Sequence, residues 1–224
     1  MLLPDTVVRT NRRSLSLVVN KRGEFIVKAP RSMSMTQVME FVKQKEKWVQ
    51  SKKARAESIL KINSGIVNGT HILFCGKTYK VEPLHGIKKI EMSDVSFYYP
   101  DKYDDVTLKY AIKKWLTTVA KKVLPNRVEY FAKLMQIDYN LVGVNNAKTM
   151  WGCCDSEFNI KLNFRLMMLP HRIIDFIIIH ELCHVLEFNH SKNFYKILSS
   201  VMPDYKDCQK ALKDYDYLLT LYRQ

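Results

Sequence analysis

One segment in the last third of the chain constrains the fold more than any other. From Ile173 to Ile179 every residue except Asp175 is apolar, and a helix that is apolar nearly all round has to lie inside the protein. The segment His180-Glu181-Leu182-Cys183-His184 follows directly. Because polar groups buried without partners are costly, the sequence predicts a central helix, opened by Pro170 and running to about Phe188, whose end carries a functional site.

These five residues form an HExxH motif, which is typical of a zinc site. Residues four apart on a helix share one face, with Cβ atoms about 5–6 Å apart, so His180 and His184 can bind the same ion. Zinc favours nitrogen ligands in a tetrahedral arrangement, and three protein ligands leave the fourth position open for water. Glu181 can reach that water without being a ligand. We therefore expect one Zn²⁺ ion, with Glu181 as the catalytic base that passes the proton to the leaving amine.

His190 is the predicted third ligand. On a continuous helix it would lie about 15 Å along the axis from His180 and point away. The helix is therefore expected to end soon after His184, with the chain turning back. Asn189 tolerates the left-handed conformation that such a turn uses, and Ser191 is suited to cap the helix that follows.

The remaining elements indicate an α+β chain. Alternating patterns predict two hairpins and four further strands, at 14–19 with 24–27 around Lys21-Arg22-Gly23, at 72–75 with 78–82, and near 87–92, 95–99, 141–145 and 158–164. Helical periodicity predicts five further helices, at 34–60 behind a Ser34–Gln37 capping box, at 104–123, at 125–135, after Ser191 and after Pro203. We expect a basic, β-rich N-terminal lobe with one long helix over residues 1–100 and a catalytic lobe over residues 101–224.

The formal charge of +14 is unevenly distributed. Residues 1–60 carry a net charge of +8, residues 61–149 carry +6, and residues 150–224 carry none. The basic character therefore lies outside the segment with the histidines. It indicates either a polyanionic partner such as nucleic acid or lysine-rich faces that are only solvated, and both readings stay open.

Cysteine usage and hydropathy indicate where the chain works. The five cysteines are odd in number and have no regular spacing, so we expect reduced thiols rather than disulfides. No apolar stretch is long enough for a secretory signal or a membrane span. The sequence therefore predicts a soluble, cytoplasmic protein without a membrane partner, and leaves its oligomeric state undefined.

From Met150 onward the chain resembles the YgjP-like zinc metallopeptidase family and, more distantly, the SprT-like zinc proteases. The resemblance rests on Trp151-Gly152-Cys153-Cys154, the segment Asn159 to Leu166, the HExxH motif, and Asn189-His190-Ser191-Lys192 with Phe194. It implies a zincin-like α+β fold with a small mixed or antiparallel sheet and a buried HExxH helix. It also implies zinc at His180, His184 and His190, and Glu181 as the catalytic acid and base.

Three features of this resemblance leave alternatives open. The family usually has serine where this chain has Cys153, which puts any role of that hydroxyl in doubt. The strand at Asn159–Phe164 is either the edge along which a peptide substrate lies or an ordinary core strand. Tyr195 and His171 are candidate oxyanion donors, or a packed and an exposed helix residue.

Three functions follow from these observations. The first is a zinc metallopeptidase that cleaves peptides or proteins. The second is a nucleic-acid-associated, SprT-like protease that uses the basic N-terminal region. The third is a zinc-stabilised interaction module without catalysis, which has less need of an open coordination site beside Glu181.

Overall fold

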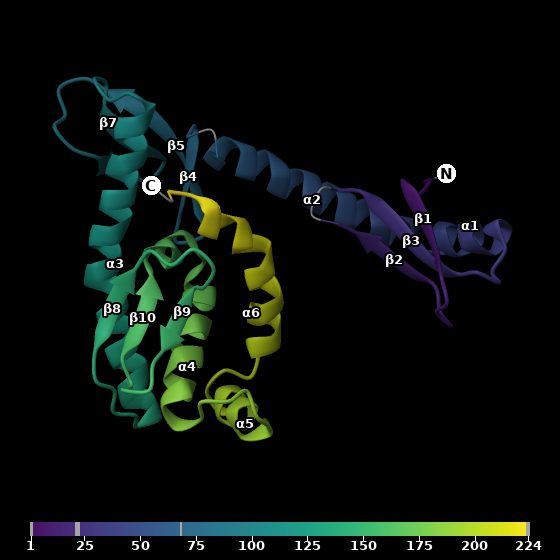
Figure 1. The fold of residues 1–224 in the computed structure, drawn as a ribbon. Helices are drawn as coiled ribbons and strands as arrows, with labels where there is room; N and C mark the ends of the chain where they lie inside the picture. The colour runs from purple at the N-terminus through teal and green to yellow at the C-terminus, as the bar shows by residue number, and fades with distance from the viewer. Residues whose placement is uncertain (1, 21–22, 68, 223–224) are drawn as a thin grey trace. The chain divides into compact units, whose positions relative to one another are not determined.

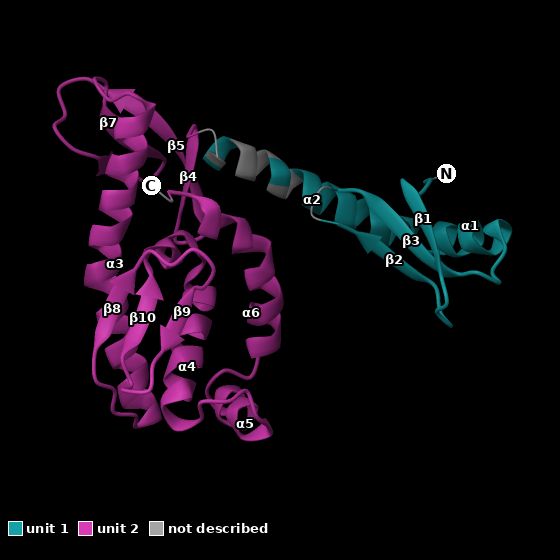
Figure 2. Ribbon diagram, viewed as in Figure 1, with its two compact units in different colours: residues 1–68 teal, residues 69–224 magenta. Residues whose placement is uncertain are grey.

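A computed structural model describes residues 2–20, 23–67 and 69–222. The chain forms two compact units, residues 1–68 and residues 69–224 (Figure 2). The sequence placed the boundary at residue 100 instead. Residues 69–100 belong to the larger unit because Cys75 N–H donates to the Met167 carbonyl at 2.8 Å, and because the ring of Trp115 packs edge-on against Phe74 and Phe97.

The smaller unit is a three-stranded sheet with two helices. Its strands are β1 (Thr6–Thr10), β2 (Ser16–Val19) and β3 (Phe25–Pro30). The central strand β3 pairs antiparallel with β2, as the predicted hairpin requires, and parallel with β1, which the sequence analysis missed. Lys21 and Arg22 of the predicted turn lie outside the described residues. The core joins strand and helix side chains, all almost fully buried: Phe25, Val27, Ala29, Val38, Val42 and Val49.

The helix predicted over residues 34–60 is two helices, α1 (Met35–Gln44) and α2 (Glu46–Val67). The predicted capping box of Ser34 and Gln37 is confirmed, since each side chain accepts a hydrogen bond from the backbone N–H of the other. The single-helix prediction was wrong at Lys45. Its N–H is shared between the carbonyls of Phe41 and Val42, and this tightened last turn ends α1.

The larger unit begins with a four-stranded sheet and a long helix. The strands β4 (His71–Phe74), β5 (Lys77–Leu84), β7 (Ser96–Pro100) and β6 (Glu91–Met92) lie side by side in that order. The antiparallel pairing of β4 with β5 confirms the second predicted hairpin.

The next helix, α3 (Asp105–Met135), replaces the two helices predicted on either side of Pro125. Proline lacks the backbone N–H that a helix interior uses. The helix nevertheless continues, because one buried apolar stripe runs through both halves and holds them against the same core. Its members include Leu116, Ala120, Leu124 and Val128, all fully buried.

A second sheet and the central helix complete the unit (Figure 1). The strands β8 (Val142–Asn145), β10 (Ile160–Asn163) and β9 (Gly152–Cys154) lie in that order, with β10 parallel to β8 and antiparallel to β9. A 3₁₀ helix, η1 (Phe164–Met168), leads to the central helix α4 (His171–Leu186). The chain ends with α5 (Lys192–Val201), α6 (Tyr205–Leu212) and the 3₁₀ helix η2 (Lys213–Thr220).

The predicted burial of α4 is confirmed. The helix packs against α3, α5, α6 and the strands β9 and β10, and every residue from Ile173 to Ile179 is buried. The α+β class with small mixed sheets is confirmed as well. All five cysteines are free thiols. None of the helices in the described part of the chain combines the length and the apolar character needed to traverse a bilayer.

Candidate metal centre

The C-terminal half of α4 carries two of the predicted ligands on one face. His180 and His184 lie one helical turn apart, with ring centroids separated by 4.9 Å. The helix ends at Leu186, and the next residue, Glu187, adopts an extended conformation with φ −147° and ψ 103°. The end of the helix two residues beyond His184 agrees with the break that the spacing predicted.

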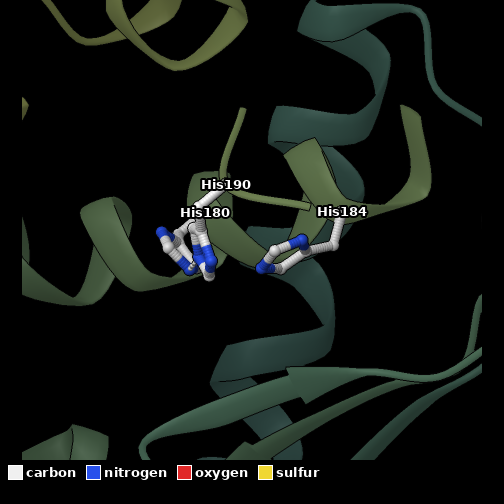
Figure 3. Close-up of side chains that lie close together, drawn as sticks. All are labelled: His180, His184 and His190. Atoms are coloured by element: carbon white, nitrogen blue, oxygen red, sulfur yellow. Dashed lines mark hydrogen bonds between the residues drawn. The ribbon is translucent and has the colours of Figure 1, made fainter. Parts of the chain in front are cut away.

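The turn after α4 brings the third histidine back to the other two (Figure 3). Nε2 of His190 lies 3.1 Å from Nε2 of His180, and its ring centroid lies 4.7 Å from that of His184. One ring nitrogen from each residue falls within 4.8 Å of the others. Asn189 does not adopt the left-handed conformation that the sequence suggested, since it is not among the described residues with positive φ. The chain leaves the helix at the extended Glu187 and bends at Phe188 and Asn189.

An aromatic ring supports all three imidazoles. Phe194 is fully buried, and its centroid lies 5.0 Å from that of His180 and 4.7 Å from those of His184 and His190. Ser191 caps α5 by accepting hydrogen bonds from the backbone N–H groups of Asn193 and Phe194, which fixes the first turn that carries the ring. The sequence did not predict this role of Phe194. The position of Phe194 in the first turn of a helix capped by Ser191, directly after His190, could have indicated that its ring lies beside the histidines.

A backbone carbonyl orients the imidazole of His184. Its Nδ1 lies 3.1 Å from the carbonyl oxygen of Glu187. A carbonyl only accepts hydrogen bonds, so Nδ1 carries the proton and Nε2 keeps its lone pair. Metal-binding histidines typically have their second ring nitrogen held in this way.

The surroundings keep the imidazoles neutral. Burial lowers the pKa of His180 to about 4, helped by the nearby rings of His184 and His190. Burial also lowers the pKa of His184. At neutral pH both rings therefore have a free lone pair, which is the form that binds a metal ion.

Glu181 follows His180 on α4, about 100° around the helix axis, and its side chain lies against strand β9. Its side chain is 6% exposed, and burial raises its pKa to about 8. Gly152 leaves the space that the carboxyl group fills, because a Cβ on residue 152 would lie 2.7 Å from Oε1 of Glu181. Among the described residues nothing donates a hydrogen bond to this carboxyl group. A buried, unpaired carboxyl with a raised pKa is suited to receive and return a proton near neutral pH.

The three histidines fit a tetrahedral metal ion. Two nitrogens bound at about 2.0–2.1 Å to a tetrahedral zinc are about 3.3 Å apart, close to the 3.1 Å between the facing Nε2 atoms of His180 and His190. In the metal-free protein one of these nitrogens can donate a hydrogen bond to the other. With a shared cation both would offer a lone pair to the metal instead. The donor set consists of three neutral imidazoles, which suits zinc.

The two candidate oxyanion donors lie in different places. The ring centroid of Tyr195 is 6.3 Å from that of His190, and the same ring stacks on Tyr205. His171 is exposed and is the first residue of α4, so it lies roughly 13 Å along the helix axis from His180. The structure therefore brings Tyr195, but not His171, near the histidine cluster.

The strand predicted as a possible substrate edge is an interior strand. β10 (Ile160–Asn163) lies between β8 and β9, and its apolar residues Ile160 and Leu162 are fully buried. The outer strand beside α4 is β9, which carries Gly152, Cys153 and Cys154. The sequence did not predict this strand, because three residues that include a glycine show no alternating pattern.

Comparisons with known proteins give one family. The family described as "YgjP-like, metallopeptidase domain" matches residues 13–215. No curated protein matches. Among solved structures, the crystal structure of the metallopeptidase zymogen of Pyrococcus abyssi abylysin is 19% identical to the chain, covers 40% of this chain and 91% of its own, and has a TM-score of 0.38.

Proposed function

Because the chain belongs to the YgjP-like metallopeptidase family, we propose that it is a zinc-dependent peptidase that holds one Zn²⁺ ion through His180, His184 and His190. One ring nitrogen from each of these residues lies within 4.8 Å of the other two, and this observation carries the proposal. His180 and His184 share one helix, but His190 comes from the turn after it. The carbonyl that fixes the His184 tautomer supports it.

The proposed chemistry divides between the metal and Glu181. When bound, zinc acts as a Lewis acid that polarises the scissile carbonyl and makes a water molecule more acidic. Glu181 takes the proton of the attacking water and passes it to the leaving amine. Burial raises the pKa of this carboxyl in the metal-free protein, which makes it a stronger proton acceptor than an exposed carboxylate.

Strand β9 is the proposed binding edge for the peptide. It is one of the two outer strands of its sheet, it lies against α4, and its Gly152 contacts the side chain of Glu181. A peptide that pairs with this edge through backbone hydrogen bonds would place its carbonyl groups beside the catalytic base.

The variants Glu181→Gln and His184→Ala test the proposal. The glutamine keeps the shape of the side chain but accepts no proton, so zinc content should stay at one ion per chain while cleavage of an unfolded protein falls by about 10²–10⁴-fold. His184→Ala should lose both zinc and cleavage. Cleavage by the glutamine variant at the wild-type rate would refute the role of Glu181. Absence of cleavage by the zinc-loaded wild type would favour the non-catalytic zinc module.

A second candidate function is binding of single-stranded nucleic acid by the smaller unit. Residues 1–68 carry 14 Lys and Arg against 5 Asp and Glu. Trp48 is 43% exposed, and Nζ of Lys52 lies 5.8 Å from its ring centroid. A cationic face with an exposed aromatic ring suits stacked bases.

Salt-dependent binding of a labelled single-stranded oligonucleotide tests this second function. We expect the affinity to fall steeply with added salt and to fall further in Trp48→Ala. The matched control is Tyr110→Ala, because Tyr110 is also an exposed aromatic, 64% accessible, but lies in the larger unit. Absence of binding at about 50 mM salt would eliminate this function.

A further inference from the structure

Two phenylalanine rings lie stacked on each other at the surface of the larger unit. Their centroids are 5.9 Å apart with an interplanar angle of 26°. Phe158 is 39% exposed and Phe188 is 50% exposed. They come from two turns 30 residues apart in the sequence, so the contact depends on the tertiary fold. We call this contact the Phe158–Phe188 pair.

One member of the pair is directly connected to the histidine cluster. Phe188 follows Glu187, whose carbonyl oxygen lies 3.1 Å from Nδ1 of His184, and it comes two residues before His190. The carbonyl of Phe188 also faces His184. The backbone at Phe188 therefore belongs to the turn that positions two of the three imidazoles, while its ring remains partly exposed.

The other member lies at the end of the proposed peptide-binding edge. Phe158 occupies the turn between β9 and β10, and both this turn and the end of α4 lie at the same end of the unit (Figure 1). A chain that follows β9 past Glu181 toward this turn would therefore meet the Phe158–Phe188 pair.

The chain holds Phe158 in a conformation that costs free energy. Its φ is 61°, in the left-handed region that bulky side chains rarely adopt. Asp155 closes the turn: its carbonyl accepts from the N–H of Phe158 at 2.9 Å, and its carboxylate accepts from the N–H groups of Glu157 and Asn159. These hydrogen bonds hold the backbone of the turn from which the ring of Phe158 stacks on Phe188.

Resting on the peptidase function above, we propose that the Phe158–Phe188 pair is a specificity subsite that binds a large apolar side chain of the peptide substrate, close to the scissile bond. Burial of a further aliphatic or aromatic side chain against two rings is favourable. The Phe158–Phe188 pair lies beside both the histidine cluster and the end of β9. Its occupant is therefore a side chain of the bound peptide, and not a separate protein.

Two peptides that differ at one position test the subsite. A fluorogenic peptide scan first locates the position near the scissile bond where phenylalanine or leucine most improves kcat/KM. A matched pair is then made with phenylalanine or alanine at that position. We expect the zinc-loaded wild type to prefer the phenylalanine peptide by roughly tenfold or more, the discrimination that an apolar pocket provides.

The variants Phe188→Ala and Phe158→Ala should reduce this preference to near one, and Phe188→Leu should retain most of it. The control Tyr110→Ala should keep it, because that exposed ring lies on α3. Zinc content and thermal unfolding of each variant show whether the fold and the histidine cluster are intact.

The outcomes separate the two proposals. An unchanged preference in both alanine variants, with zinc retained, would overturn the subsite and leave the peptidase function standing. Equal cleavage of both peptides by the wild type would also overturn the subsite and leave the peptidase function standing. Absence of any peptide cleavage by the zinc-loaded wild type would overturn the peptidase function itself.

Discussion

Gly152 and Glu181 fill the same space between β9 and α4. A Cβ on residue 152 would lie 2.7 Å from Oε1 of Glu181, 2.9 Å from its Cγ and 3.0 Å from its Cδ. Gly152 does not have the positive φ that requires glycine. The glycine is therefore needed for the room that it leaves to the carboxyl group, and not for its backbone conformation.

Replacement of Gly152 by alanine should displace Glu181 and leave the fold intact. The backbone accommodates alanine, so the side chain of Glu181 has to move. A displacement of about 1 Å at a catalytic group can lower activity about 10²-fold, and we expect a fall of that order in kcat with zinc still bound.

The matched control for this prediction is Gly143→Ala on β8 of the same sheet. A Cβ there meets only Cγ of Lys161, at 3.8 Å, which is an ordinary van der Waals contact. Steady-state kinetics and zinc analysis of both variants make the comparison. Equal activity of the two variants would show that the position of Glu181 is not set by Gly152.

The contribution of His190 is measurable through metal affinity. His190→Ala removes one of three imidazoles, so zinc should bind much more weakly. Binding of zinc to the folded state alone raises stability by about 2.7 kcal/mol at a free concentration of 100 times Kd. We therefore expect added zinc to raise the Tm of the metal-free wild type but not that of His190→Ala.

His85→Ala is the control for the His190 experiment. His85 is an exposed histidine that hydrogen-bonds to Asp101 and does not belong to the histidine cluster. Its variant should respond to zinc like the wild type. A full zinc response in His190→Ala would remove His190 from the ligand set.

The sequence predicted the parts of this site that depend on local spacing. His180 and His184 are one helical turn apart, so their shared face follows from helix geometry alone. The position of His190 required only that the helix end, and α4 does end at Leu186.

Relationships formed by tertiary packing were out of reach of the sequence. The contact between Gly152 and Glu181 depends on how β9 lies against α4, and no periodic pattern marks a strand of three residues. The continuity of α3 through Pro125 was missed for a similar reason, because a buried stripe on both sides of the proline outweighs the loss of one hydrogen bond. Phe158 and Phe188 stack across 30 residues, and neither residue alone predicts the contact.

An ion pair between α3 and α4 should stabilise the fold. The guanidinium of Arg127 donates two hydrogen bonds of 2.7 Å to the carboxylate of Asp175, five residues before His180. The hydrogen bonds with Asp175 raise the pKa of Arg127. Removal of one partner leaves the carboxylate, which is 11% exposed, without its counter-ion.

We expect Arg127→Ala to destabilise the protein by about 2 kcal/mol, less than the usual cost for a fully buried pair because Arg127 is 41% exposed. In a chain of this size that corresponds to a decrease of roughly 4–8 °C in Tm. Arg127→Lys should recover part of the loss, since it keeps the charge but not the two-point contact. Arg172→Ala is the control, because its ion pair with Asp204 is exposed on both sides.

The last prediction concerns the thiol of Cys154 on the outer strand. Burial raises its pKa to about 11, and the charges of Glu181 and Asp155 add to the shift. A raised thiol pKa means that the protonated, unreactive form persists up to about pH 11. Alkylation at pH 8 should therefore be about 10²-fold slower than for an exposed cysteine, and it should speed up continuously as the pH rises.

Peptide-level mass spectrometry after timed alkylation of the metal-free protein measures this rate for Cys154 separately from the other thiols. Glu181→Gln removes a negative charge that opposes the thiolate, so the pKa of Cys154 should fall and labelling at pH 8 should become faster. Lys161→Ala has the opposite expectation for the neighbouring Cys153, whose pKa the Lys161 charge lowers. If Cys154 labelled equally fast in the wild type and in Glu181→Gln, the carboxyl group would not lie against β9 as the contact with Gly152 requires.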